Sequence, residues 1–134
     1  MRYEIINLKC LKMKNFKELK IWQKGFEIAV DSYTIINSLP SSDRSSLAQQ
    51  ITHAAVSIPS NIAEGGSRSS EKDFCRFLEM SLGSSFELET QLLIAKAGHS
   101  NAGQITVNNT LTKLDEEQKM IISFMKKINL THNS

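Results

Sequence analysis

Hydrophobic residues recur at spacings of three and four along most of the chain, which is the period of an amphipathic helix. Breaks at Pro40, Gly65–Gly66 and Gly98–Gly103 divide this pattern into four runs. We therefore predict four helices, over residues 17–39, 46–65, 70–97 and 104–130. No segment alternates as a half-buried strand would, and no internal repeat occurs. Four helices with short connections predict an all-α, up-down-up-down four-helix bundle.

The first predicted helix carries two apolar stripes. The broader stripe, which we expect to face the core, consists of Leu19, Trp22, Phe26, Ala29, Val30, Tyr33 and Ile36. The narrower stripe consists of Ile21, Ile28 and Ile35, which lie roughly 140–180° from it. A helix that faces a single core needs only one stripe. The second stripe is therefore either internal too, or meets another subunit along a coiled-coil-like seam.

The other three helices each have a continuous apolar arc that we expect to face the core. In the second helix the arc is Leu47, Ala48, Ile51, Ala54, Ala55, Ile58 and Ile62. In the third it is Phe74, Phe77, Leu78, Ser81, Ser85, Leu88, Leu92 and Ala95. In the last it is Val107, Leu111, Leu114, Ile121, Met125 and Ile128, interrupted by Gln118.

The third helix also has apolar residues outside its core arc, namely Cys75, Leu82, Phe86 and Leu93. Soluble monomers rarely expose large contiguous apolar patches. We therefore predict a ring-shaped homo-oligomer joined through these four residues and through Ile21, Ile28 and Ile35. In such a ring, Ile28→Glu should prevent assembly and leave the helix content largely intact. The alternative is a monomer in which both sets of residues are internal.

The second helix contains Pro59, which removes one helical hydrogen bond and costs about 3 kcal/mol in a regular helix. We expect a bend there, toward the turn that follows Gly65–Gly66. Asn61, Glu64 and Arg68 are close enough in sequence to form a polar network at this turn, with Glu64 paired to Arg68 or to a backbone donor. A ligand or partner site at the same residues is the alternative.

The composition is that of one globular domain. At 134 residues, with 40% hydrophobic and 22% charged residues, the chain is long enough to bury its own core. The net charge of +2 does not require a polyanionic partner. Cys10 and Cys75 have no disulfide or metal spacing, which favours a cytoplasmic location. No stretch resembles a signal peptide or a membrane span, so we expect no membrane partner.

Lysines crowd the beginning of the first helix. Lys17, Lys20 and Lys24 occupy one arc of that helix, and Lys14 is close by. On a monomer such a stripe is usually a solvated face. In a ring of identical subunits it would repeat as a basic belt able to neutralise several phosphates. These four lysines are therefore the candidate nucleic-acid-binding residues, and any binding should be weak and independent of sequence.

Residues that could catalyse a reaction lack the partners that a reaction needs. His53 and Ser57 share one helix face, but Glu64 lies about three turns from His53 and cannot orient its ring directly. The chain has no metal-ligand spacing, no glycine-rich phosphate loop and no paired-carboxylate site. We therefore predict a protein that is not an enzyme, with no metal, no cofactor and no small-molecule substrate.

Three stretches resemble a known family of helical bundles. They are Phe16–Lys24 (FKELKIWQK), Ala55–Gly65 (AVSIPSNIAEG) followed by Arg68, and Phe77–Glu89 (FLEMSLGSSFELE). All are similar to the four-helix-bundle proteins encoded in intervening sequences of bacterial 23S ribosomal RNA genes. The resemblance extends from Phe16 to Ala97 and fades over the last helix. We therefore expect residues 16–134 to form the bundle and residues 1–15 to be an N-terminal extension, ordered or disordered.

The resemblance also implies an assembly and a class of partner. Some family members accompany the reverse transcriptase of diversity-generating retroelements, as the accessory variability determinant, and form five-fold rings. The resemblance thus implies a pentamer that associates with RNA, DNA or a reverse transcriptase, and it implies no catalytic residue. Members commonly carry a basic pair where this chain has Thr52-His53, which weakens a nucleic-acid role for the second helix. A purely structural or protein-interaction module without nucleic-acid contact is the alternative.

Overall fold

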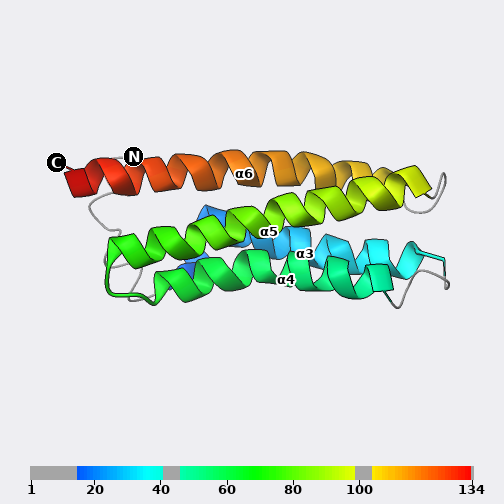
Figure 1. Cartoon of the computed structure of the whole chain (residues 1–134), viewed down its shortest axis with the longest axis horizontal. Helices are drawn as coiled ribbons and strands as arrows, with labels where there is room; N and C mark the ends of the chain where they lie inside the picture. Colours follow the sequence, from blue (N-terminus) through cyan, green and yellow to red (C-terminus); the bar gives the residue numbers. More distant parts are fainter. Residues whose placement is uncertain (1–14, 41–45, 99–103, 134) are drawn as a thin grey trace.

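Four long helices, running alternately up and down, form the protein (Figure 1). The structure is a computed structural model that describes residues 15–40, 46–98 and 104–133. A short 3-10 helix, η1 (Phe16–Glu18), is followed by α3 (Lys20–Ser38), α4 (Ser46–Gly66), α5 (Glu71–Gly98) and α6 (Gln104–Asn133). The described residues contain no strand. The predicted all-α, four-helix fold is therefore confirmed, while the predicted extension, apart from Asn15, lies outside the described residues.

Each helix packs against the next, and α6 packs against α3, so α3 and α5 lie on one diagonal of the bundle. One end of the bundle therefore brings together the beginnings of α3 and α5 and the ends of α4 and α6 (Figure 1). The opposite end holds the other four helix ends. None of the helices in the described part of the chain is long and apolar enough to cross a membrane.

The helix boundaries follow from local capping chemistry. The side chain of Asn15 accepts a hydrogen bond from the Lys17 N–H at 3.0 Å and starts η1. The Ser70 hydroxyl accepts from the Asp73 N–H at 3.1 Å, as an N-cap does, and Asp73 adds negative charge to the first turn of α5. At the other end of α3, the helix stops before Leu39, just ahead of Pro40.

The core is a continuous set of aliphatic and aromatic side chains from all four helices. Its largest fully buried members are Phe74, Ile28, Ile35, Ile51, Ile58, Ile62, Leu78, Leu88, Leu92, Leu114, Ile121 and Ile128. Burying a side chain of this size stabilises the fold by about 1.5–3 kcal/mol. The predicted core arcs of α4, α5 and α6 are confirmed, with Leu47, Leu111 and Met125 only partly buried.

The core face of α3 differs from the prediction. Ile21, Ile28 and Ile35 lie inside the subunit, with exposed fractions of 3% or less, so they form no seam on its surface. The broader stripe, expected in the core, is divided. Leu19 and Ala29 are buried and Trp22 and Ile36 pack against the core, as predicted, but Phe26, Val30 and Tyr33 are about half exposed. This result corrects both the predicted core face of α3 and the α3 half of the predicted oligomer interface.

Two small residues explain why α3 turns its isoleucines inward. Gly25 and Ser32 share the buried arc with the isoleucines. A Cβ at Gly25 would lie only 3.1 Å from Ile58 Cγ2, so the glycine lets α3 approach α4 closely. Ser32 remains satisfied because its hydroxyl donates to the Ile28 carbonyl at 2.8 Å. Neither residue contributes to the hydrophobic periodicity of the sequence. Their small size nevertheless favours burial of this face of α3.

The α4 helix continues without interruption through Pro59, which is buried. Ser81 of α5 donates to the Ile58 carbonyl at 2.9 Å, just before the proline. Near the end of α4, a Cβ at Gly65 would lie 2.8 Å from Phe77 Cβ, so this glycine also permits close helix packing. The α4–α5 pair is therefore tightly joined along its length, and the bend expected at Pro59 stays a prediction.

Candidate functional site

The polar network predicted at the α4–α5 turn forms only in part. Arg68 donates to Glu64 Oε1 at 2.9 Å, which is the predicted pair. Asn61 is not joined to them, because its amide donates to the Ser57 carbonyl one turn earlier, at 2.8 Å. The Glu64–Arg68 pair is solvent-exposed and spaced as i and i+4, so it contributes only a few tenths of a kcal/mol.

Arg68 also belongs to a stack around Phe77. The guanidinium groups of Arg68 and Arg76 lie 4.7 and 4.6 Å from the centre of the Phe77 ring. Arg76 is also 3.7 Å from Asp73. This arrangement holds two arginine side chains against the beginning of α5 and leaves their charge near the surface. It is a structural stack that brings positive charge to one end of the bundle.

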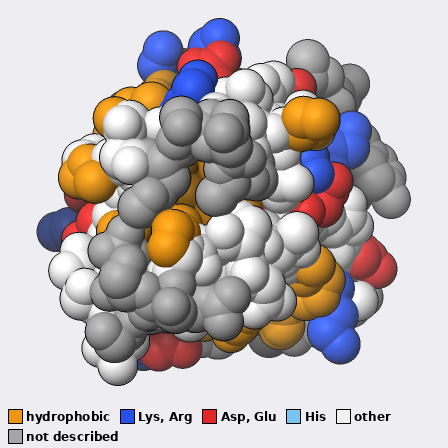
Figure 2. Space-filling model, turned by 90° about the vertical axis from the view of Figure 1, so that its right-hand side faces the viewer, with side chains coloured by type: hydrophobic (Ala, Val, Ile, Leu, Met, Phe, Trp, Pro, Cys, Tyr) orange, Lys and Arg blue, Asp and Glu red, His pale blue; other side chains and the backbone are white. Residues whose placement is uncertain are grey.

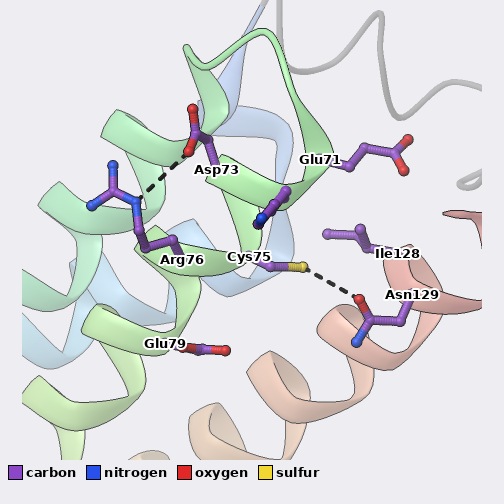
Figure 3. Close-up of a pocket in the computed structure, with 8 residues that line it drawn as sticks. Glu71, Asp73, Cys75, Arg76, Glu79, Ile128 and Asn129 are labelled. Atoms are coloured by element: carbon purple, nitrogen blue, oxygen red, sulfur yellow. Dashed lines mark hydrogen bonds and ion pairs between the residues drawn. The ribbon is translucent and has the colours of Figure 1, made fainter.

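A pocket of about 610 Å³ lies at the same end, between the beginning of α5 and the end of α6 (Figure 3). Its lining residues are Glu71, Lys72, Asp73, Cys75, Arg76, Glu79, Ile128 and Asn129. The Cys75 thiol contacts Asn129 Oδ1 at 3.9 Å, and an amide oxygen is not a base that could activate it. The pocket mixes acidic and basic groups.

A second hollow, of about 680 Å³, lies between α3 and α4. Its lining residues are Tyr33, Ala48, Gln49, Thr52, His53, Val56, Ser57 and Ser60. The Ser57 hydroxyl lies 2.9 Å from the Ala54 carbonyl and 2.5 Å from Ser84 Oγ, so local polar partners occupy it. Glu64 is paired with Arg68. His53 and Ser57 therefore line the same hollow, but Ser57 is hydrogen-bonded to other groups and Glu64 is paired elsewhere. Among the described residues, no group of three or more His, Cys, Asp or Glu could hold a metal ion.

The predicted lysine stripe divides in the structure. Lys17 and Lys20 are exposed. Lys24, in contrast, points toward α6 and forms an ion pair with Glu116 at 3.2 Å. Lys14 lies outside the described residues. The stripe is therefore smaller than predicted on α3 itself, because one of its members links two helices of the same subunit.

Other lysines extend the positive charge beyond α3. Lys72 at the beginning of α5 and Lys126 near the end of α6 are exposed and lie at the same end of the bundle as Lys17 and Lys20. None of these four lysines has an ion pair within the described part of the chain. We call Lys17, Lys20, Lys72, Lys126, Arg68 and Arg76 the basic end. Acidic residues lie there too, and two of them, Glu64 and Asp73, pair with the arginines.

The middle and the opposite end of the bundle have a different charge pattern. Lys113 pairs with Asp31 at 2.6 Å and with Glu27 at 3.0 Å. The hydrogen bonds that Lys113 donates to Asp31 and Glu27 raise the pKa of Lys113, which keeps this cross-helix cluster charged. Lys119 pairs with Asp115 at 2.9 Å. On the opposite end, Figure 2 shows lysine and arginine side chains of the described residues around the rim, several with acidic side chains beside them.

The apolar surface outside the core forms two separate faces. On one side, the α3/α4 face consists of Phe26, Val30 and Tyr33 of α3 and Val56 of α4, all exposed. Trp22 borders it, stacked on Phe26 with the ring centres 5.2 Å apart. On the other side, the α5/α6 face consists of Phe86 and Leu93 of α5 and Ile122 of α6, with half-buried Leu82 beside them. Cys75, the fourth residue predicted at an interface on α5, is also half-buried and packs against the core.

The most unusual polar residue in the structure was not predicted from the sequence. Glu117 of α6 is fully buried, and both of its carboxyl oxygens have no hydrogen-bond partner among the described residues. Burial raises its pKa from 4.5 to about 8, against the opposing effect of the positive charge on Lys24. Its neighbour Gln118 is also buried and donates to Glu89 of α5 at 2.8 Å. In the sequence, both belong to a polar run that is typical of a solvated helix face.

The fold and these surfaces define an antiparallel helical bundle with a basic end and two exposed apolar faces. The model of the 23S rRNA-intervening sequence protein family matches residues 17–123, and the chain belongs to this family. The resemblance seen in the sequence is therefore confirmed, and it extends through most of the last helix.

A solved structure agrees with the fold. The chain is similar to a protein of unknown function from the S23 ribosomal protein family of Bacteroides thetaiotaomicron, with a TM-score of 0.72 and 23% sequence identity. The similarity covers 79% of this chain and 98% of the other. At this identity it supports the fold alone. No curated protein matches the chain.

Proposed function

We propose that this chain is a non-enzymatic cytoplasmic bundle that assembles with copies of itself and associates with nucleic acid or a ribonucleoprotein. The observation that carries the nucleic-acid part is the basic end. Its four lysines lack ion pairs among the described residues, whereas the lysines in the middle of the bundle are paired with acids. Such lysines can release counterions from a phosphate backbone, which favours binding to RNA or DNA.

The two apolar faces support the self-assembly part of the proposal. They are formed by different pairs of helices on opposite sides of the bundle. A contact between two different patches is head-to-tail, and it closes into a ring when the rotation between neighbours allows it. In this arrangement the α3/α4 face of one subunit meets the α5/α6 face of the next. The ring size of five rests on the family alone.

Assembly would also strengthen nucleic-acid binding. One basic end offers only a few phosphate contacts, and binding through a few contacts is weak at physiological salt. In a ring of parallel subunits the basic ends would lie on one side and bind one strand or duplex together, which raises the effective affinity. A reverse transcriptase with its bound RNA is a partner of this chemical class. A purely structural module without nucleic-acid contact is the alternative function, and it would use the same apolar faces.

The nucleic-acid part is tested by binding a fluorescent RNA and a DNA duplex at several salt concentrations. The wild type should bind both, with log K falling by about 0.9 per log unit of salt for each phosphate neutralised on B-DNA. Replacing Lys17, Lys20, Lys72 and Lys126 together by glutamine should weaken binding and flatten this slope. Lys96→Gln, an exposed lysine near the end of α5, is the control and should change little. Unchanged affinity in the fourfold variant would contradict the proposal and favour the structural alternative.

The assembly part is tested by light scattering on purified protein. A pentamer has five times the monomer mass of 15.0 kDa. Phe26→Asp, on the α3/α4 face, and Phe86→Asp, on the α5/α6 face, should each lower the mass to that of smaller species while the helix content remains. Ile105→Asp is the matched control, because Ile105 is exposed but lies outside both faces. A wild-type mass of 15.0 kDa at micromolar concentration ends the assembly proposal.

A further inference from the structure

Glu117 lies at one spot where three helices meet. A Cβ built on Gly25 of α3 would lie 2.9 Å from Glu117 Oε2, 3.1 Å from Ile58 Cγ2 and 3.5 Å from the Pro59 nitrogen. The absent side chain of Gly25 therefore leaves the space that the carboxyl group of α6 occupies beside the α4 backbone. Gly25, Pro59 and Glu117 form one buried cluster, and Glu117 is its only titratable member.

Pro59 changes the hydrogen-bonding chemistry of this spot. A proline has no N–H, so the Ala55 carbonyl four residues earlier cannot receive its usual helical hydrogen bond. A buried carbonyl without a donor destabilises the fold. Glu117 Oε2 and the Pro59 nitrogen both lie beside the same Gly25 position, so the unpaired carboxyl group is close to the proline. A protonated carboxyl group can supply that donor, whereas a carboxylate cannot.

The charged groups around the cluster do not offer a partner to an ionised Glu117. From α3, the positive charge of Lys24 acts on Glu117 and lowers its pKa, but Lys24 is paired with Glu116. The titratable residues of α4, His53 and Glu64, are both exposed.

The other two helices do not offer a partner either. From α5, Glu89 is an acid and accepts from Gln118. On α6 itself, Lys113 is held by Asp31 and Glu27. An ionised carboxylate at this depth would therefore be an uncompensated buried charge.

We infer that Glu117 is incorporated into the fold as a neutral carboxylic acid that donates its proton to the Ala55 carbonyl left without a donor by Pro59, so that the bundle loosens when this group ionises. The carboxyl group thereby joins α6 to α4 across the core. The interior proline leaves a carbonyl without a donor, and the buried acid supplies a donor that needs an acceptor. The result is a pH-sensitive hydrogen bond between α4 and α6, which belong to the first and second halves of the chain.

The direction of the pH dependence follows from linkage. The pKa of Glu117 is about 8 in the folded protein and 4.5 is its ordinary value, so between these pH values the folded state holds a proton that the unfolded state has lost. The stability from this group is fully present below pH 4.5 and is lost as the pH rises through about 8. Within that window the unfolding constant should increase about tenfold per pH unit, which corresponds to one proton.

The test is urea unfolding of the full chain between pH 5 and 9, with Glu117→Gln as the main variant. The glutamine amide can donate to the same carbonyl but cannot ionise, so the variant should lose the one-proton slope and be more stable than the wild type at pH 9. Glu87→Gln is the matched control, since Glu87 is an exposed glutamate on α5, and it should keep the wild-type slope. Equal slopes in the wild type and Glu117→Gln would overturn the inference.

The acceptor is tested separately by Pro59→Ala, which supplies an N–H to the Ala55 carbonyl. The pKa of Glu117, followed by NMR of its side-chain carbon, should fall in this variant because the neutral acid now competes for its acceptor. An unchanged pKa would show that the proton is not donated there. A Glu117 pKa below 5 in the wild type would also overturn the inference, and this measurement does not depend on any variant folding.

Discussion

The two apolar sides of α3 have similar hydrophobicity but opposite environments. Ile21, Ile28 and Ile35 are enclosed by the other helices, whereas Phe26 and Tyr33 on the α3/α4 face are about half exposed. The aromatic side carries the larger hydrophobic surface, so hydrophobicity alone did not select the buried side. The difference shows that close approach of the backbones, made possible by Gly25 and Ser32, determined which side faces the core.

The two sides should therefore contribute to different equilibria. The isoleucine side is in contact only within the subunit, so it stabilises folding. The aromatic side gains little from folding, because about half of each side chain remains in water. Its remaining apolar area can be buried only against another molecule. Substitutions on the two sides separate these contributions.

The largest effect is expected for Ile28, which has no exposed surface. Ile28→Ala should lower the free energy of unfolding by about 2–5 kcal/mol, from lost burial and the cavity left behind. Ile28→Glu should lose helix content altogether, because it places an unpaired charge in the core. This reverses the expectation from the sequence, in which Ile28→Glu affected assembly alone. Urea unfolding followed by circular dichroism measures both variants.

Val30→Ala is the matched control on the opposite side of α3. Val30 is about half exposed, so removing its methyl groups should change the stability of the subunit by no more than about 0.5 kcal/mol. A loss comparable to that of Ile28→Ala would contradict the assignment of the two sides. If assembly occurs through the α3/α4 face, Val30→Ala should instead shift the concentration at which the complex dissociates.

Most of the fold was predictable because its signals are local. Pro40 and Gly65–Gly66 end α3 and α4 at the expected places, and the apolar arcs of α4 and α5 face the core as predicted. The inward face of α3 was not predictable from hydrophobic periodicity, because a glycine and a serine occupy positions on it. Their effect depends on the surface of α4 that they meet. Such complementarity between helices is not encoded in either helix alone.

The candidate sites also divide into features that local sequence predicts and features that depend on packing between helices. The Glu64–Arg68 pair follows from a spacing of four residues and was predicted. The basic end was not predicted, because Lys72 and Lys126 come close to Lys17 only through the antiparallel packing of three helices. Glu117 was missed for the opposite reason. Its position in an Asp-Glu-Glu-Gln run is typical of a solvated face, and only the space beside Gly25 makes room for its burial.

Two glycines lie in helix interiors with opposite surroundings, Gly25 on the inner side of α3 and Gly83 on the outer side of α5. Gly25→Ala should destabilise the subunit by about 1–3 kcal/mol through overpacking. The new methyl would lie 2.9 Å from Glu117 Oε2 and 3.1 Å from Ile58 Cγ2, and the enclosed carboxyl group has little room to move. Thermal or urea unfolding at pH 6 measures the effect. An unchanged or increased stability would contradict the tight packing of α3 on α4.

Gly83→Ala should have the smallest effect and the opposite sign. No atom lies within 4 Å of a Cβ built at Gly83, so an alanine meets no steric conflict there. Alanine also loses less backbone entropy than glycine on entering a helix, which favours the folded state by about 0.5–1 kcal/mol. The same unfolding experiment should therefore show a small increase in stability. A decrease, together with a lower mass by light scattering, would mean that another subunit packs against this side of α5. A decrease at constant mass would contradict the open outer surface that distinguishes Gly83 from Gly25.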